Sequence, residues 1–253
     1  MATPITRSAF VEGKVISNTR LSERLYALKI NMTMQAFRAG QFVRLQLPVG
    51  EEKVAKSYSL VNAPDDPVAE VFFNTVPDGC LSNALAALQA GDTVEVSQPA
   101  NGFFVLEELP QKPELWLFAT GTGLGPYLSM LRTEKIWQQF EKVVLIHGVA
   151  IRDELAYQEL IQTALAEHPE QLQYISCVTR EPNPDGFEGR LTEALSSGWL
   201  EQQTAMTISA DNSAIMLCGN HAMIQDMKAL LKERGMKKHL RHKAGNIVTE
   251  QYF

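Results

Sequence analysis

Cysteine is scarce in this chain of 253 residues, and long apolar runs are missing. The three cysteines, Cys80, Cys177 and Cys218, are widely separated and form no CxxC pair. This spacing supports neither a disulfide framework nor a zinc or iron–sulfur site, so any redox chemistry requires an organic cofactor. No apolar run approaches the roughly 20 residues that a membrane helix needs, and the N-terminal segment lacks a signal-peptide core. We therefore expect a cytoplasmic protein with no membrane association.

The chain also lacks a surplus of positive charge. Its formal net charge is −6, which argues against general nucleic-acid binding. One stretch differs: between Lys228 and Lys243 there are seven basic residues and the single acid Glu233. Two interpretations remain open for this stretch. It is either a surface that steers an acidic partner or a solvated helix end whose lysines the helix dipole favours.

Short strands separated by turn signals dominate the first hundred residues. β-branched and aromatic residues, several of them alternating with polar ones, predict strands at Leu25–Ile30, Phe42–Leu47, Tyr58–Asn62, Val71–Val76 and Thr93–Val96. Apolar residues at helical spacing predict one small helix over Leu81–Leu88. Many short strands with one helix are typical of an antiparallel barrel.

The pattern changes after Pro113. Buried-type strands are predicted at Leu115–Thr120, Val143–His147, Tyr174–Thr179 and Ile215–Cys218, with amphipathic helices at Glu154–Glu167 and Ala222–Arg234. Strands that alternate with helices indicate a doubly wound parallel sheet, in which ligands bind beyond the carboxyl ends of the strands. We place the boundary near Glu107–Pro113 and expect two domains, residues 1–108 and 109–253.

A glycine-rich segment, Gly121–Pro126, follows the first strand of the second half and opens a helix. Glycines allow close backbone approach to a ligand, and a helix N-terminus attracts phosphate. The GxGxG spacing is not the GxGxxG dinucleotide fingerprint, so a tight structural turn is the alternative interpretation.

Five motifs occur in a fixed order along the chain. They are KSYS at 56–59, VPDGCLS at 76–82, ATGTGLGP at 119–126, CGN at 218–220 and EQYF at 250–253. In this order the chain resembles the ferredoxin–NADP reductase family, in its short bacterial form with an aromatic end, from about Gly13 to Phe253. The resemblance implies an FAD-binding barrel followed by an NADP-binding α/β domain, with the C-terminal tail returning to the flavin between them.

The resemblance also implies which residues hold FAD. Those expected at the flavin, its ribityl chain or its phosphates are Lys56, Ser57, Tyr58, Ser59, Phe72, Phe73, Asn74, Cys80, Leu81, Ser82, Thr122, Tyr252 and Phe253. Cys80, Leu81 and Ser82 are expected to offer loop backbone to the phosphates. Without the resemblance, the terminal Tyr-Phe pair is interpreted as a frayed end.

For NADP(H), the residues that the resemblance implies are Gly121, Gly123, Val149, Ala150, Arg152, Thr179, Arg180 and Arg190. Two arginines are suited to a ribose 2′-phosphate, because a guanidinium is always charged and binds phosphate bidentately. The residues expected near the reacting rings are Ser59, Cys218, Glu250 and Tyr252. For Cys218 the alternative is a small buried apolar residue, and for Glu250 a surface or helix-end carboxylate.

Two positions depart from the family pattern. Lys56 stands where arginine is usual, which keeps the charge and loses the two-pronged geometry. Ala150 stands where relatives have an arginine, with Arg152 as a substitute from the same loop, and this weakens the preference for NADP over NAD.

The implied activity is an exchange of hydride with NADP(H) and of single electrons with ferredoxin or flavodoxin. The partner is expected to dock near Lys237, Lys238, Arg241 and Lys243, and the chain is expected to be a monomer. Two rivals remain: a reductase of the same architecture with another acceptor, such as free flavin, quinone or a ferric siderophore, and a non-catalytic FAD-binding sensor or electron-transfer subunit.

Overall fold

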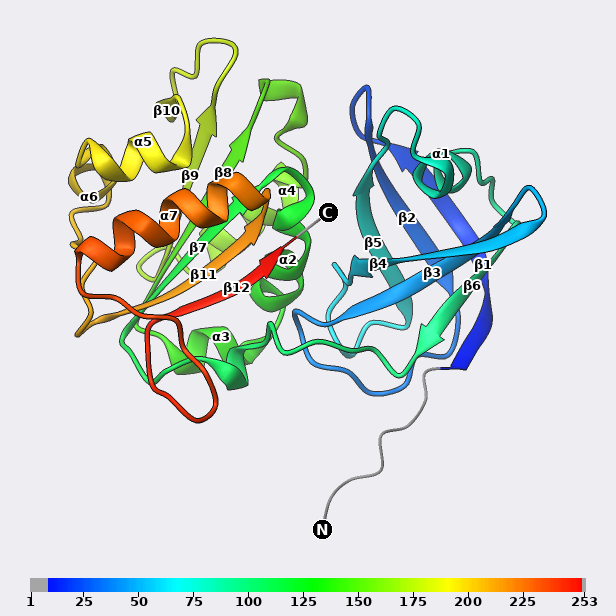
Figure 1. Cartoon of the computed structure of the whole chain (residues 1–253), viewed down its shortest axis with the longest axis horizontal. Helices are drawn as coiled ribbons and strands as arrows, with labels where there is room; N and C mark the ends of the chain where they lie inside the picture. The colour runs from blue at the N-terminus through cyan, green and yellow to red at the C-terminus, as the bar shows by residue number, and fades with distance from the viewer. Residues whose placement is uncertain (1–8, 252–253) are drawn as a thin grey trace. The chain divides into compact units, whose positions relative to one another are not determined.

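The structure, a computed structural model, describes residues 9–251. The chain divides after Val105 into two compact units, which we call the N-terminal unit and the C-terminal unit. The first contains strands and the short helix α1, and the second a central sheet flanked by helices (Figure 1). An antiparallel barrel followed by a doubly wound α/β sheet, the predicted fold class, is confirmed.

A six-stranded antiparallel sheet forms the N-terminal unit, in the order β4-β3-β6-β1-β2-β5. Its elements are β1 (Ala9–Arg20), β2 (Leu25–Asn31), β3 (Phe42–Val49), β4 (Glu52–Ser59), β5 (Val68–Asn74), α1 (Cys80–Ala86) and β6 (Thr93–Gln98). An isolated bridge between Leu60 and Val71 joins the two edges just beyond β4 and before the end of β5. The sheet therefore curls on itself around one apolar face.

That face carries the core of the N-terminal unit. Alternate residues of the strands, such as Leu28, Ile30, Val43 and Leu45, are almost fully buried in it. Helix α1 adds its own apolar side through Leu81 and Leu85. Burying each such aliphatic side chain contributes about 1.5–3 kcal/mol to folding.

The predicted strand Tyr58–Asn62 is wrong in its position. The strand β4 runs from Glu52 to Ser59, so KSYS lies at its end and not at its start. The chain turns at Gly50, whose φ of 64° suits glycine, and pairs back on β3 directly. Because β4 is an edge strand, charged residues are tolerated at its exposed positions. These charged residues interrupt the apolar pattern from which the strand would have been predicted.

The C-terminal unit contains a parallel six-stranded sheet in the order β10-β9-β8-β7-β11-β12. Its strands are β7 (Glu114–Thr120), β8 (Lys142–Val149), β9 (Leu172–Val178), β10 (Phe187–Glu188), β11 (Ser213–Gly219) and β12 (Ile247–Gln251). Its α-helices are α2 (Gly125–Leu131), α3 (Glu134–Gln139), α4 (Gln158–Glu167), α5 (Leu191–Ser196), α6 (Trp199–Thr204) and α7 (His221–Glu233). Three 3₁₀ turns complete it: η1 (Leu106–Glu108), η2 (Gly121–Leu124) and η3 (Arg152–Glu154).

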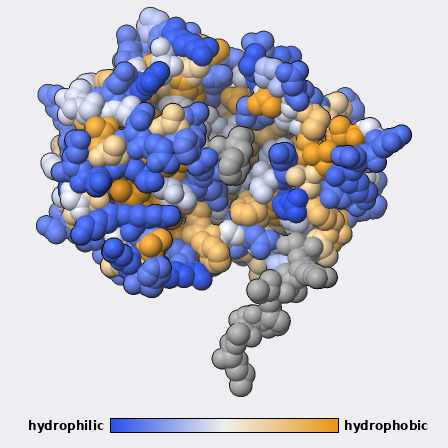
Figure 2. All heavy atoms as spheres, viewed as in Figure 1, coloured by the Kyte–Doolittle hydropathy of each residue, from blue (hydrophilic) through white to orange (hydrophobic). Residues whose placement is uncertain are grey.

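Helices cover both faces of this sheet (Figure 1). On one face α5, α6 and α7 pack against Trp116, Phe118, Val144 and Ile146. The opposite face carries the alternate strand residues and is covered by α2, α3 and α4. The outward side of α7 is polar, and Figure 2 shows a mainly hydrophilic surface there.

The predicted helix Glu154–Glu167 begins later than expected. Residues 152–154 form η3, and Tyr157 takes a left-handed φ of 58° immediately before α4. A left-handed residue cannot continue a right-handed helix, so α4 starts at Gln158. None of the helices in residues 9–251 is long and apolar enough to cross a membrane.

Candidate functional site

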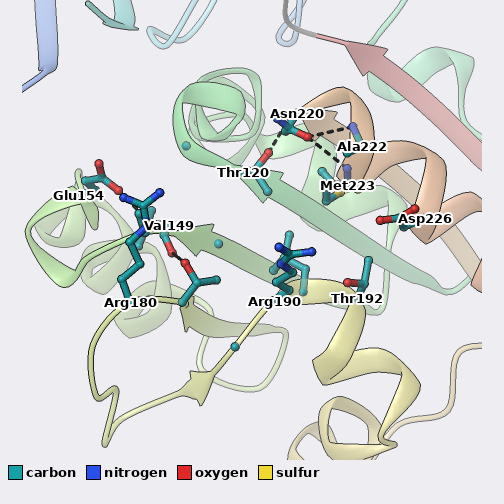
Figure 3. A pocket seen from close by; sticks show the side chains of 16 residues that line it. Thr120, Val149, Glu154, Arg180, Arg190, Thr192, Asn220, Ala222, Met223 and Asp226 are labelled. Atoms are coloured by element: carbon teal, nitrogen blue, oxygen red, sulfur yellow. Dashed lines mark hydrogen bonds between the residues drawn. The ribbon is translucent and has the colours of Figure 1, made fainter. Parts of the chain in front are cut away.

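A pocket of about 400 Å³ opens at the carboxyl ends of the parallel strands of the C-terminal unit. The loops after β7, β8, β9 and β11 all contribute to it (Figure 3). Its walls are formed by Thr120, Gly121, Gly148, Val149, Ala150, Glu154, Thr179, Arg180, Gly189, Arg190, Leu191, Thr192, Asn220, Ala222, Met223 and Asp226. The pocket lies where a parallel sheet is expected to bind its ligand.

The N-terminus of α7 forms one wall of this pocket. Asn220 caps the helix, because its Oδ1 accepts hydrogen bonds from the amides of Ala222 (2.9 Å) and Met223 (3.3 Å). The amide of Asn220 in turn donates to Oγ1 of Thr120 at 2.8 Å, as Figure 3 shows. The partial positive charge at the start of this 13-residue helix favours an anion in the pocket.

Two arginines stand on another wall. Arg180 follows β9 and Arg190 precedes α5, and both side chains are exposed. Their backbone is fixed by bonds within the unit: the Arg180 amide donates to Ala150 O at 2.9 Å, and the Arg190 amide donates to Glu193 Oε2 at 2.7 Å. Figure 3 shows both guanidinium groups at the pocket, with Glu154 near Arg180.

The loop after β8 carries the position where the family pattern has arginine. Ala150 lines the pocket, and its amide donates to Glu154 Oε2 at 2.9 Å. The Glu154 carboxylate therefore lies on the same wall. Arg152 is exposed and is not among the residues that form the wall; its amide donates to the Glu181 carboxylate.

The glycine-rich segment serves two purposes. Gly121 takes a left-handed φ of 53°, has open space around its Cα and lines the pocket. Gly123 is buried and is not part of the wall: a Cβ there would lie 2.5 Å from the carbonyl oxygen of Cys218. Gly123 thus allows η2 to pack directly on β11. Thr122, which lies between the two glycines in the sequence, is half-buried.

Cys218 and Glu250 come together at the end of the sheet. They are register partners on the neighbouring parallel strands β11 and β12, and Cys218 is fully buried. The hydroxyl of the buried Tyr127 donates to Phe118 O at 3.2 Å. Burial raises the pKa of Tyr127 well above its usual value, and the nearby Cys218 and Glu250 raise it further. Glu250 is therefore a strand residue of this cluster and not a helix-end carboxylate.

In the N-terminal unit the ends of the two edge strands meet. The Tyr58 ring at the end of β4 contacts Phe73 of β5 edge-on, with centroids 6.0 Å apart, and Phe73 stacks on Tyr26. Lys56 and Ser57 are exposed, and Ser59 is 5% exposed. Phe72 and Phe73 are buried and Asn74 is exposed. The structure thus brings Tyr58 of the KSYS motif against Phe73 near the end of β5.

The first turn of α1 lies beside them. Cys80, Leu81 and Ser82 form the first turn of α1, which begins one residue before the predicted helix Leu81–Leu88 and has Gly79 at its N-cap position. Burial raises the pKa of Tyr58 to about 12, and the neighbouring Cys80 thiol adds to this effect. The first amides of a helix have no partner within it, so this turn presents donors next to Tyr58.

Sequence reasoning missed several residues of the pocket. Glu154, Thr192 and Asp226 reach it from separate elements and belong to no motif, so no sequence signal marks them. Thr120 and Asn220 belong to quoted motifs, and their hydrogen bond becomes visible once β7 and β11 are known to be neighbours. Tyr252 and Phe253, expected at the flavin, lie outside the described residues.

Comparison with known proteins assigns the chain to a protein family. The family described as "Oxidoreductase FAD-binding domain" matches residues 12–104, and "Oxidoreductase NAD-binding domain" matches residues 117–229. The chain is 35% identical to a flavodoxin/ferredoxin–NADP reductase of Buchnera aphidicola, over 96% of this chain and 99% of that protein. The chain belongs to the flavodoxin/ferredoxin–NADP reductase family.

Other members of the flavodoxin/ferredoxin–NADP reductase family agree with this assignment. The Escherichia coli reductase is 40% identical over 217 residues, which cover 86% of this chain and 88% of that protein. The crystal structure of a ferredoxin NADP+ reductase from Neisseria gonorrhoeae, with bound FAD and NADP, superposes with a TM-score of 0.91. It is 32% identical and covers 96% of this chain and 99% of its own. The predicted family is therefore confirmed.

Proposed function

We propose that this protein is an FAD-dependent reductase of the cytoplasm that exchanges hydride with NADP(H) and single electrons with ferredoxin or flavodoxin. In this proposal residues 1–108 bind FAD and residues 109–253 bind the nucleotide. The observation that carries it is the pair of arginines at the pocket of the C-terminal unit, together with the capped N-terminus of α7. Both favour an anionic dinucleotide with an extra phosphate.

The residues of the C-terminal pocket fit NADP(H). Arg180 and Arg190 would hold the ribose 2′-phosphate, with Thr179 beside them. The backbone at Gly121, Val149 and Ala150 leaves room for the rest of the nucleotide, because these positions carry small or no side chains into the pocket. Arg152 would assist from outside the wall.

The residues of the N-terminal unit fit FAD. Lys56 supplies a cation on an exposed strand edge, and the first turn of α1 supplies backbone donors from Cys80, Leu81 and Ser82. The half-buried ring of Tyr58 offers an apolar face near Ser59, whose hydroxyl would meet the flavin edge. Ser57, Phe72, Phe73 and Asn74 complete the proposed set in this unit, with Thr122, Tyr252 and Phe253 from the other.

Bound FAD would supply the conversion between one two-electron hydride and two single electrons. The residues of the chain would hold the two rings in contact and keep water out. Cys218, a buried and compact side chain, would lie against the nicotinamide without covalent chemistry. Ser59, Glu250 and Tyr252 would orient the rings from their edges, since the structure sets Glu250 beside Cys218.

The basic loop after α7 would dock the acidic protein partner. Lys237, Lys238 and Lys243 are exposed. Arg241 donates two hydrogen bonds, of 2.8 and 2.6 Å, to the carboxylate of Glu108. This ion pair ties the loop to η1, so the three lysines are the candidates for steering. Reversing them to glutamate should slow electron transfer to flavodoxin and reduce its salt dependence; an unchanged salt dependence would contradict this docking surface.

The proposed nucleotide assignment is tested by Arg180→Ala combined with Arg190→Ala. Each charged hydrogen bond is worth about 1.5–3 kcal/mol, so the pair should raise KM for NADPH by at least about a hundredfold. KM for NADH should stay within about twofold. Arg24→Ala, at an exposed arginine of the N-terminal unit, is the matched control. An equal loss for NADPH and NADH would contradict the assignment.

A further inference from the structure

His147 is the feature of the C-terminal unit that the proposed function leaves unused. It lies near the end of β8, where every residue from Val143 to Val149 is buried, and its own side chain is 0% exposed. An imidazole in such an apolar strand is costly unless its nitrogens are paired. One ring nitrogen of His147 has a hydrogen-bond partner and the other has none. We therefore look for the role of His147 in the one hydrogen bond that it makes.

That bond reaches the pocket wall. Nε2 of His147 lies 3.0 Å from the carbonyl oxygen of Gly121, at the junction of β7 and η2. A carbonyl accepts, so Nε2 carries the proton and donates. Nδ1 then carries the lone pair, and it is one of two buried side-chain polar atoms in residues 9–251 that have no hydrogen-bond partner. Burial lowers the pKa of His147 to about 4, although the bond to Gly121 opposes the shift, so the ring is a neutral donor at working pH.

The bond fixes the orientation of a peptide group. In a planar trans peptide the C=O of one residue and the N–H of the next point in opposite directions. Holding the Gly121 oxygen toward His147, inside the unit, therefore aims the amide of Thr122 away from the interior. Gly121 is the first residue of η2, has a φ of 53°, and a Cβ at this position would meet no atom within 4 Å, so the bond from His147 adds a side-chain anchor where glycine supplies none.

We propose that His147 is a positioning residue: its Nε2–H holds the Gly121–Thr122 peptide in the orientation that receives the nucleotide at the β7 end of the pocket. This inference rests on the proposed function. The arginine end belongs to the loop after β9, two strand spacings or roughly 10 Å away across β8. His147 should therefore act on the part of the nucleotide that lies farther from Arg180.

The test uses the FAD-loaded enzyme and two ligands, NADP+ and adenosine 2′,5′-bisphosphate, titrated by calorimetry. The bisphosphate reaches the arginine end but lacks the nicotinamide half. His147→Leu should weaken NADP+ binding by about tenfold, the value of one hydrogen bond, and leave bisphosphate binding within about twofold. KM for NADPH should rise in parallel with kcat less affected.

Two further variants separate positioning from packing. The amide nitrogen of glutamine can take the place of Nε2, whereas that of asparagine takes the place of Nδ1, so His147→Gln should bind NADP+ nearly as wild type and His147→Asn should not. Equal weakening of both ligands in His147→Leu, or unchanged NADP+ binding, would overturn the inference. A wild-type enzyme that binds neither ligand would overturn the proposed function itself.

Discussion

In the proposed function the two units bind their ligands by different means. The N-terminal unit would offer side chains of its edge strand β4, such as Lys56 and Tyr58. The C-terminal unit offers mainly backbone and loop residues at the ends of parallel strands. A site built from side chains is sensitive to the identity of each residue. A site built from loop backbone is sensitive to the residues whose hydrogen bonds fix the conformation of the loops.

Within residues 9–251 each unit holds one buried side-chain polar atom without a hydrogen-bond partner, and in both cases another atom of the same side chain anchors a neighbouring backbone segment. His147 holds the start of η2, and Asn18 of β1 donates through Nδ2 to the carbonyls of Leu85, Ala86 and Leu88 at the end of α1. These anchors are therefore the places where the comparison between the units can be tested. All five histidines and all three tryptophans belong to the C-terminal unit. Tryptophan fluorescence therefore reports on the unfolding of the C-terminal unit.

The largest expected effect is the response of the C-terminal unit to acid. The folded pKa of His147 is about 4 and its unfolded value is 6.5, so the unfolded chain binds more protons between these values. The contribution of His147 to the free energy of unfolding should be fully present above pH 6.5. The free energy of unfolding should then fall by about 3 kcal/mol as the pH is lowered from 6.5 to 4. Urea unfolding followed by tryptophan fluorescence measures this loss.

His147→Leu is the control for this prediction. The variant has no imidazole to protonate, so the difference between its stability and that of the wild type should depend on pH across the same window. A constant difference between pH 7 and pH 4 would contradict the assignment of acid sensitivity to His147.

The second prediction concerns the anchor of the N-terminal unit. Asn18→Leu removes three hydrogen bonds of 2.9, 3.2 and 3.0 Å and leaves carbonyls at the end of α1 without this donor. It should destabilise the unit by about 2 kcal/mol and lower the temperature at which FAD is released. Flavin fluorescence during heating measures that release. Asn18→Asp, which keeps the shape and loses the donor, should behave similarly; a release temperature equal to wild type would contradict the role.

The smallest expected effect is at Lys56, where the side-chain character of the N-terminal site is tested directly. Lys56→Arg restores a two-pronged donor and should tighten FAD binding by a few-fold, while Lys56→Ala should weaken it by about tenfold. FAD titration of the apoprotein measures both, with exposed Lys29 changed to alanine as the control. FAD affinity that is indifferent to both changes would place the pyrophosphate elsewhere.

The sequence predicted elements whose pattern reflects burial. β7, β8, β9 and β11 are apolar because they are buried on both faces, and their predicted positions agree with the structure to within a few residues. β1 was not predicted, because most of its residues are exposed or half-buried and no apolar alternation marks it. β12 follows a basic loop and is held by pairing with β11, a long-range contact that no local pattern reveals.

The residues of the pocket also divide into those that the sequence indicates and those that only long-range contacts bring together. The family resemblance implied six residues that the structure places in the pocket wall, Gly121, Val149, Ala150, Thr179, Arg180 and Arg190. The carboxylates of Glu154 and Asp226 reach the wall because of the way the loop after β8 and helix α7 fold back over the sheet. The role of His147 depends on a bond between neighbouring strands' ends, so it required the structure.

The visible spectrum of the purified protein, recorded before and after anaerobic addition of NADPH or NADH, tests the reductase function. We expect flavin bands in the protein as isolated and bleaching by NADPH that is much faster than by NADH. A protein without flavin, or with flavin that neither nucleotide reduces, would contradict the reductase function and favour a non-catalytic flavin-binding role.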